Sequence, residues 1–276
     1  MIDPLHLLVV GAHPDDCSIK AGGIAATYVE AGHDVTFCSA TDGSAGHHEL
    51  DRDALARRRR AEAEAVSDVL EVDYEVFDVP DGELVASLEH RHRFVEFLRD
   101  VDPDLVLGPR PNDYHPDHRA CATLLRDAAY LLIVPNVCPE TPALDEPPTF
   151  GFVPDPFEQP TPFDPDVVLD VTDVADRKLD ALHCHESQVY EWLPYTTDQL
   201  DAVPDDDAAR RAWLERGGPD HLLDVTEANV ADRFRDALVD RYGPEVGKAV
   251  EHAEAVEFAE YGTIPSSGRR DELFFF

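Results

Sequence analysis

The chain has 276 residues, of which 58 are Asp or Glu and 23 are Lys or Arg, giving a formal net charge of -35. A charge of this size repels nucleic acid and anionic membrane surfaces, so neither is an expected partner. The hydrophobic fraction of 43% is ordinary for a globular protein and excludes wholesale disorder. The length allows one large α/β domain with an elaborated tail.

Acidic residues are dispersed along the whole chain, and lysine stands only at Lys20, Lys178 and Lys248. Charges of one sign destabilise the compact state unless counterions screen them, over a Debye length of about 3 Å at 1 M salt. We therefore expect a halophilic source and a stability that increases with KCl, rather than a merely acidic mesophilic surface.

Cysteine usage and the apolar segments indicate a cytoplasmic protein. The five cysteines are odd in number, scattered and without a CxxC pair, which favours free thiols in a reducing compartment. The opening apolar stretch, Leu5–Val10, is too short for a signal-peptide core and has no basic region before it. No apolar run approaches the roughly 20 residues of a membrane helix.

The first half of the chain alternates strand-like and helix-like segments. The expected strands are His6–Val10, Asp34–Ala40, Tyr74–Val79 and Leu105–Gly108, and the expected helices are Gly22–Ala31, Ala54–Leu70 and Leu88–Asp100. This order predicts a Rossmann-like α/β fold, with a mostly parallel sheet and helices on both faces. No GxGxxG or P-loop pattern follows the first strand, so dinucleotide binding is not supported.

The second half is less regular. Residues 135–165 are proline-rich and without periodicity, and we expect an irregular segment that could cover a site. The later elements expected are a strand at Val167–Val171 and helices at Val174–His185, Val230–Tyr242 and Glu245–Ala259. We therefore divide the chain into an α/β domain, residues 1–190, and an acidic helical C-terminal extension packed on it, residues 191–276.

Two polar clusters follow the first and fourth expected strands. One runs from Gly11 to Asp16 and the other from Arg110 to His118. Ligands bind open α/β sheets at the carboxyl ends of the strands, so these clusters are expected to share one site.

Three residues of these clusters have the character of metal ligands. His13 and Asp16 stand three apart across a proline-stiffened turn, and His118 could complete a His-Asp-His set. Three N/O ligands with an open position are typical of catalytic zinc, and the same set could hold ferrous iron.

The remaining polar residues, Asp15, His115 and Asp117, supply a candidate base and acid for metal-assisted hydrolysis. Taken alone, HxxD is usually a turn with a helix cap, and HPDH could be an Asp-capped helix start. Their joint occurrence at two strand ends of one α/β unit favours a site.

With these motifs, AHPDD at 12–16 and HPDH at 115–118, the chain resembles the LmbE/PIG-L N-acetylglucosaminyl deacetylases. Further matches in chain order are Thr41–Gly46, Arg59 with Glu62, Pro80–Leu84, and Lys178 with His185–Gln188, so that the likeness covers roughly residues 5–190. The chain departs from the family at Cys17 and Ser18, where a glutamate is usual at one of the two, and at Ser44, where many members are acidic.

The resemblance implies a role for each matching residue. The implied zinc ligands are His13, Asp16 and His118; Asp15 is the implied general base; His115 is implied to stabilise the oxyanion or protonate the leaving amine, oriented by Asp117; and Arg59 and Asp81 are implied to contact sugar hydroxyls. The departures spare the implied zinc ligands.

The sequence thus predicts a zinc-dependent hydrolase that removes an acetyl group from an N-acetylglucosamine-type small molecule. Homo-oligomers are compatible with the resemblance. A zinc amidohydrolase acting on another small amide fits the same motifs. A non-catalytic carbohydrate-binding module on the same fold is a further alternative, against which the intact Asp15 and His115 argue.

Overall fold

The computed structural model describes residues 4–219, 222 and 227–276, and within them seven strands form one sheet of order β3-β2-β1-β4-β5-β7-β6. The strands are β1 (His6–Gly11), β2 (Asp34–Ser39), β3 (Asp73–Val76), β4 (Leu105–Gly108), β5 (Thr149–Phe152), β6 (Val167–Asp170) and β7 (Ala253–Gly262). Strands β1 to β5 pair in parallel, whereas β7 runs antiparallel to β5 and β6. The predicted, mostly parallel sheet is confirmed.

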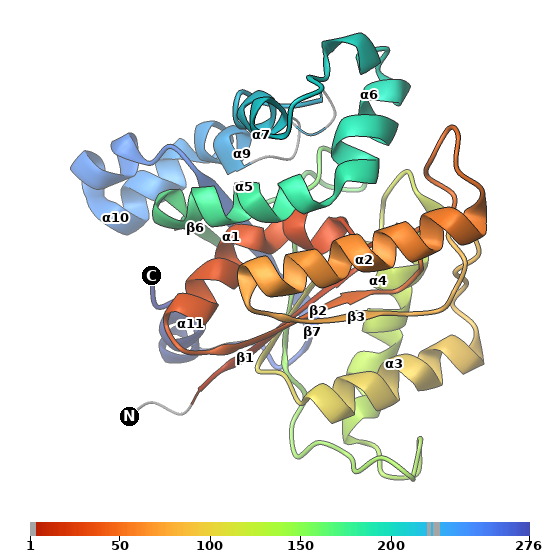
Figure 1. Cartoon of the computed structure of the whole chain (residues 1–276). Helices are drawn as coiled ribbons and strands as arrows, with labels where there is room; N and C mark the ends of the chain where they lie inside the picture. Colours follow the sequence, from red (N-terminus) through yellow and green to blue (C-terminus); the bar gives the residue numbers. More distant parts are fainter. Residues whose placement is uncertain (1–3, 220–221, 223–226) are drawn as a thin grey trace.

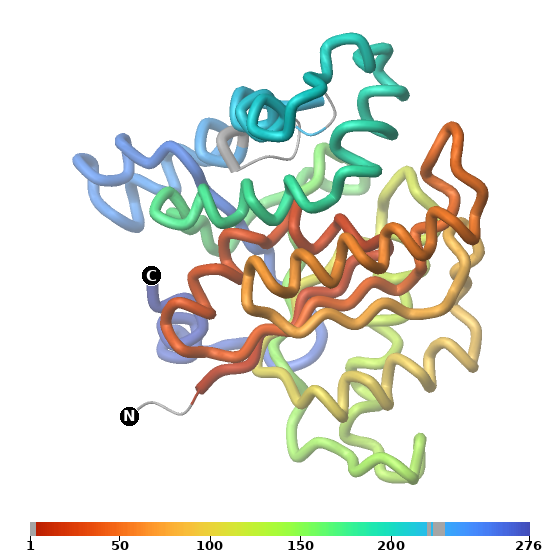
Figure 2. Tube along the Cα trace, viewed as in Figure 1, coloured from red at the N-terminus to blue at the C-terminus, as the bar shows by residue number. Residues whose placement is uncertain are grey.

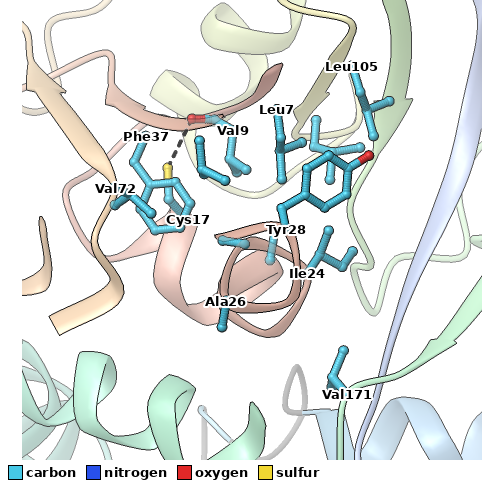
Figure 3. Close-up of a cluster of buried hydrophobic side chains, with 14 of the residues drawn as sticks. Leu7, Val9, Cys17, Ile24, Ala26, Tyr28, Phe37, Val72, Leu105 and Val171 are labelled. Atoms are coloured by element: carbon cyan, nitrogen blue, oxygen red, sulfur yellow. Dashed lines mark hydrogen bonds between the residues drawn. The ribbon is translucent and has the colours of Figure 1, made fainter. Parts of the chain in front are cut away.

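Helices cover both faces of the sheet (Figure 1). One face carries α1 (Asp16–Glu30), α2 (Arg52–Leu70) and α5 (Ala175–Cys184), and the other carries α3 (Leu88–Val101) and α4 (Pro116–Ala129). Strand β1 alternates between these layers, because Leu7 and Val9 pack on the α1 side and Leu8 and Val10 on the α4 side. Figure 3 shows the first of these two cores, where Leu7 and Val9 lie beside Tyr28 of α1.

Further helices join these elements and continue beyond residue 190. They are η1 (Leu131–Ile133), η2 (Thr172–Val174), the π-helix η3 (Ser187–Trp192), α6 (Leu193–Thr196), η4 (Leu200–Ala202), α7 (Asp207–Glu215), α9 (Glu227–Arg233), α10 (Arg235–Ala249) and α11 (Ser267–Leu273). The trace returns from the helices at the top of the view to the sheet and ends near α1 (Figure 2). Among the described helices, none is both long enough and apolar enough to cross a membrane.

Two expectations for the second half were wrong. The segment expected to continue as a helix to Ala259 instead forms β7, which lies between β5 and β6. Alanine and glutamate favour helices, but here Ala253 and Ala255 are fully buried in the sheet, and tertiary packing overrides the propensity. The segment 135–165 is irregular for most of its length but contributes β5. The C-terminal extension therefore completes the sheet as well as adding helices.

A buried ion pair connects β7 to α1. Helix α1 is interrupted at Ala21, and the amides of Gly23 and Ile24 donate to the Glu254 carboxylate at 2.9 and 2.7 Å. Lys178 of α5 pairs with the same carboxylate at 2.8 Å. A side chain at Gly23 would place its Cβ 2.8 Å from Val171, so only glycine allows this approach. These contacts hold the helix that begins at Asp16.

Candidate active site

The two polar clusters meet where the strand order reverses. Strands β1 and β4 are parallel neighbours, with β2 and β3 on one side and β5 on the other. This is the switch point at which open α/β sheets bind ligands. A Cβ at Gly11 would lie 2.5 Å from that of Asp16, so the glycine lets the chain fold back after β1.

The three predicted metal ligands form a compact triangle. His13 Nδ1 lies 3.2 Å from His118 Nε2, which lies 3.3 Å from Asp16 Oδ2, and the third side, from His13 Nδ1 to Asp16 Oδ2, measures 3.6 Å. Ligands at zinc distances of about 2.0–2.1 Å in a tetrahedron stand roughly 3.4 Å apart. The donor set and its spacing therefore fit a zinc-type ion.

The electrostatics of the triangle also favour a cation. Burial by itself lowers the pKa of His118, but Asp16 and Asp113 outweigh it and raise the pKa to about 9. The pKa of His13 is likewise raised despite burial, by hydrogen bonds to three aspartates. A site that stabilises positive charge on both imidazoles provides the field that a divalent ion requires.

Carboxylates face the outer nitrogen of each histidine. Asp113 Oδ2 lies 3.0 Å from His118 Nδ1, while His13 Nε2 lies 3.2 Å from Asp81 Oδ1 and 3.6 Å from Asp117 Oδ2. Such partners orient a ligating imidazole and fix its tautomer. Asp81, for which the sequence implied sugar contact, thus lies against His13, although it also lines the cavity of the site.

The candidate base, Asp15, is held by Arg59. The Arg59 guanidinium donates to Asp15 Oδ1 and, at 3.3 Å, to the Gly43 carbonyl. Gly43 has φ +64° and the guanidinium packs where a side chain would stand, which explains the glycine in this loop. Arg59, the second residue for which the resemblance implied a sugar contact, is only 2% exposed and contacts the candidate base.

The candidate acid, His115, has a defined tautomer. Its Nδ1 accepts a hydrogen bond from the Asp117 backbone N–H at 3.2 Å, so the neutral ring carries its proton on Nε2. Burial lowers the pKa of His115, and the charges of His13 and His118 lower it further. Asp117 therefore contacts His115 through its main chain, while its carboxylate accepts from the amides of Gly82 and Leu84 at 2.7 and 3.2 Å.

Two departures from the family pattern lie beside the ligands. Cys17 is buried in the sheet–helix interface, and its Sγ donates to the Val9 carbonyl at 3.3 Å (Figure 3). Burial raises the pKa of this thiol, and the thiol group points away from the ligand triangle into the core. Ser18 Oγ lies 3.0 Å from His185 Nε2, which joins α1 to the end of α5.

All the predicted site residues except Asp117 line a cavity of about 680 Å³. Further lining residues that the sequence did not single out are Lys20, Asp113, Tyr114, Asp155, Phe157 and Trp192. Asp113 and Tyr114 stand inside the second polar cluster and could have been found there. Nothing in the sequence marks Trp192. The irregular segment 135–165 contributes only residues 155–157 to the wall.

Comparison with known proteins identifies the family. A family model described as PIG-L, GlcNAc-PI de-N-acetylase, matches residues 8–129. The diacetylchitobiose deacetylase of Thermococcus kodakarensis is 32% identical over 210 residues, which cover 70% of this chain and 75% of that protein. The chain belongs to the PIG-L family. Another relative of this PIG-L protein, the 4-oxalmesaconate hydratase of Pseudomonas putida, is 30% identical over 197 residues, covering 68% of this chain and 76% of that protein.

Solved structures show the same fold. The N,N'-diacetylchitobiose deacetylase from Pyrococcus horikoshii superposes with a TM-score of 0.69 at 24% identity, covering 93% of the PIG-L chain and 84% of its own. GalB, the 4-carboxy-2-hydroxymuconate hydratase from Pseudomonas putida, gives a TM-score of 0.66 at 22% identity. The superposition covers 95% of this chain and 97% of GalB. Relatives named as deacetylases and as hydratases thus share this architecture.

Proposed function

We propose that this PIG-L family protein is a zinc-dependent N-deacetylase that hydrolyses the acetamide of an N-acetylglucosamine-type small molecule. The observation that carries the proposal is the triangle of His13, Asp16 and His118 atoms, 3.2–3.6 Å apart, with Asp15 and His115 in the same cavity. The relatives named as deacetylases of N-acetylated sugars support it.

The reaction adds water to the acetamide carbonyl and breaks the C–N bond, giving acetate and a free amine. Zinc, when bound by the three ligands, supplies a Lewis acid that polarises the carbonyl and acidifies water. Asp15, oriented by Arg59, accepts the proton of the attacking water.

His115 acts on the carbonyl oxygen of the same acetamide. Its Nε2–H donates to the carbonyl oxygen as negative charge develops there, an interaction of a kind worth roughly 3–4 kcal/mol. The leaving nitrogen must receive a proton, and Asp15 returns to it the proton that it accepted from the water, so that His115 keeps its Nε2 proton. Its protonated Nε2 results from the hydrogen bond that Nδ1 accepts.

The charge of the cavity favours this chemistry over the hydration of a carboxylate substrate such as the 4-carboxy-2-hydroxymuconate in the name of the Pseudomonas structure. Apart from the ligand triangle, whose charge a bound zinc ion would offset, the carboxylates that line the cavity are Asp15, Asp81, Asp113 and Asp155, against Lys20 and Arg59. Arg59 is already paired with Asp15. A substrate without several negative charges is the better partner for such a wall.

Acetate release from a panel of N-acetylated sugars and unrelated small amides tests the proposal. We expect release from at least one sugar by the zinc-loaded protein, and an Asp15→Asn variant that retains its zinc but loses roughly 10²–10⁴-fold in rate. Metal content is measured by elemental analysis of both proteins. No release from any sugar would remove the substrate assignment, and a fully active Asp15→Asn variant would remove the base assignment.

A further inference from the structure

The turn between β1 and α1 carries two of the three ligand-triangle residues and the candidate base within the stretch from His13 to Asp16. Its own hydrogen bonds tie the main chain to a ligand atom. The Asp16 N–H donates to the His13 carbonyl at 3.2 Å, and Asp16 Oδ2 accepts from the amides of Ala12 and His13 at 2.8 and 2.9 Å. A shift of this turn therefore moves the ligand atoms with it.

The peptide group between Pro14 and Asp15 lies at the centre of the turn. Proline has no N–H, so the main chain at residue 14 can be held only through its carbonyl. On the far side, the Asp15 carbonyl accepts from the Ile19 N–H at 3.0 Å, which starts α1. Rotation of the peptide before Asp15 would redirect the carboxylate that Arg59 contacts. A contact with the Pro14 carbonyl thus controls the direction of the base.

The Pro14 carbonyl accepts a hydrogen bond from the hydroxyl of Tyr74 on the edge strand β3. Strand β2 lies between β3 and β1, so the Tyr74 ring reaches across β2 to the turn. There it packs edge-on against Phe37, its register partner, with ring centroids 5.5 Å apart. This aromatic contact fixes the direction in which the hydroxyl points.

The surroundings of the hydroxyl keep it a donor to this carbonyl. Burial raises the pKa of Tyr74, and the neighbouring Cys17, Asp15 and Asp16 raise it further. The Cys17 side chain lies within hydrogen-bonding reach of the same hydroxyl, but burial raises the pKa of this thiol, and a neutral sulfur is a weak acceptor. A glutamate at position 17 would instead present a charged oxygen, which is a stronger acceptor.

We propose that Tyr74 is a positioning residue of the active site, whose hydroxyl fixes the peptide between Pro14 and Asp15 and so aims both the base and the ligand atom of Asp16. For the base, this role rests on the proposed deacetylase function, whereas for Asp16 it needs only a bound zinc ion. Tyr74 is not among the described residues that line the cavity, so it acts through the turn and not on a substrate.

Tyr74→Phe tests the role, because it removes the hydroxyl and keeps the ring against Phe37. We expect the zinc affinity to fall roughly tenfold, measured by competition with a chromophoric chelator, since His13 and Asp16 lose the contact that fixes their turn. With N-acetylglucosamine and the zinc-loaded protein, kcat should fall by about tenfold, while KM changes less than about twofold. Unchanged zinc affinity, or a rise in KM at constant kcat, would overturn the role.

Tyr28→Phe is the matched control. Tyr28 is fully buried in the same core, and its hydroxyl donates to the backbone carbonyl of Leu273, away from the site. Each variant loses one hydroxyl-to-carbonyl hydrogen bond, so both should lose a similar amount of thermal stability. Only Tyr74→Phe should lose zinc affinity and kcat.

The two proteins also separate this role from the deacetylase proposal. Equal losses of zinc affinity in Tyr74→Phe and Tyr28→Phe would mean that the hydroxyl of Tyr74 only stabilises the fold, and the positioning role would be overturned. If the unchanged protein releases no acetate, the proposed reaction is wrong, and a loss of zinc affinity confined to Tyr74→Phe would still support the control of the ligand turn by Tyr74.

Discussion

Each histidine of the ligand triangle uses one ring nitrogen for the triangle and turns the other toward a carboxylate. For His118 the partner is Asp113, whose second oxygen also accepts from the His115 backbone at 2.8 Å. One aspartate therefore positions both a ligand and the candidate acid. The His118 ring can rotate about its side-chain bonds, so its orientation depends on the contact with Asp113.

Removing the Asp113 carboxylate should weaken metal binding without removing a ligand. For Asp113→Ala we expect zinc affinity to fall roughly 10–100-fold, because the His118 ring loses the acceptor that fixes its tautomer. Competition with a chromophoric chelator measures the affinity. Asp100→Ala, an exposed position on α3, is the control and should bind zinc like the unchanged protein. Equal affinities for the two variants would contradict the positioning role.

The residues of the site were predictable in part. His13, Asp16 and His118 follow from two short motifs at the ends of parallel strands, because the sheet brings those ends together. The contacts of Arg59 with Asp15 and of Asp81 with His13 were not predictable. The two pairs are separated by 44 and 68 positions in the sequence, and the contacts depend on how α2 and the loop after β3 pack. Trp192 stands outside both motifs, and its place in the cavity results from the π-helical turn that ends at this residue.

Among the elements, α1 has the most demanding environment. Its interruption at Ala21 directs two backbone amides at Glu254, which is 2% exposed and also holds the ammonium of Lys178. A buried pair of charges adds little to stability as a whole, but the loss of one member leaves the other charge in a low-dielectric interior.

Glu254→Ala should therefore be strongly destabilising. We expect the free energy of unfolding to fall by about 3–5 kcal/mol, measured by urea titration at constant salt. Glu260→Ala replaces an exposed glutamate on the same strand and should change it by less than about 0.5 kcal/mol. If both variants lost a similar free energy of unfolding, the loss would come from replacing any glutamate of β7 and not from breaking the ion pair of Glu254 with Lys178.

The elements themselves show where sequence patterns are reliable. The first four strands were predicted to within a few residues, since short apolar runs bounded by glycine, proline or aspartate have few alternatives. Strand β7 was missed because alanine and glutamate, which favour helices, dominate its first half, and because its first four residues are all buried and show no alternation of period two. The partners that override this preference, β5 and β6, are about a hundred residues away in the sequence.

At the scale of the whole molecule, four of the few basic residues, Arg59, Arg99, Arg110 and Lys178, are buried in specific interior contacts. Arg99 is 5% exposed and donates to the carbonyls of Leu131, Leu132 and Val134, among others in that loop. Arg59 is also buried in the site. The surface therefore holds fewer positive charges than the composition suggests, and acidic groups repel one another across it.

Screening of this repulsion should stabilise the fold. We expect the thermal midpoint to rise by about 5 °C or more between roughly 0.1 M and 1 M KCl, equivalent to about 2 kcal/mol for a chain of this size, because the Debye length falls from about 10 to 3 Å. Circular dichroism during heating measures the midpoint. NaCl at equal ionic strength should act alike, since screening does not depend on which monovalent cation is present. A midpoint that is the same at both concentrations would mean that the net charge of -35 is already tolerated without counterions, and that the acidic surface reflects no adaptation to salt.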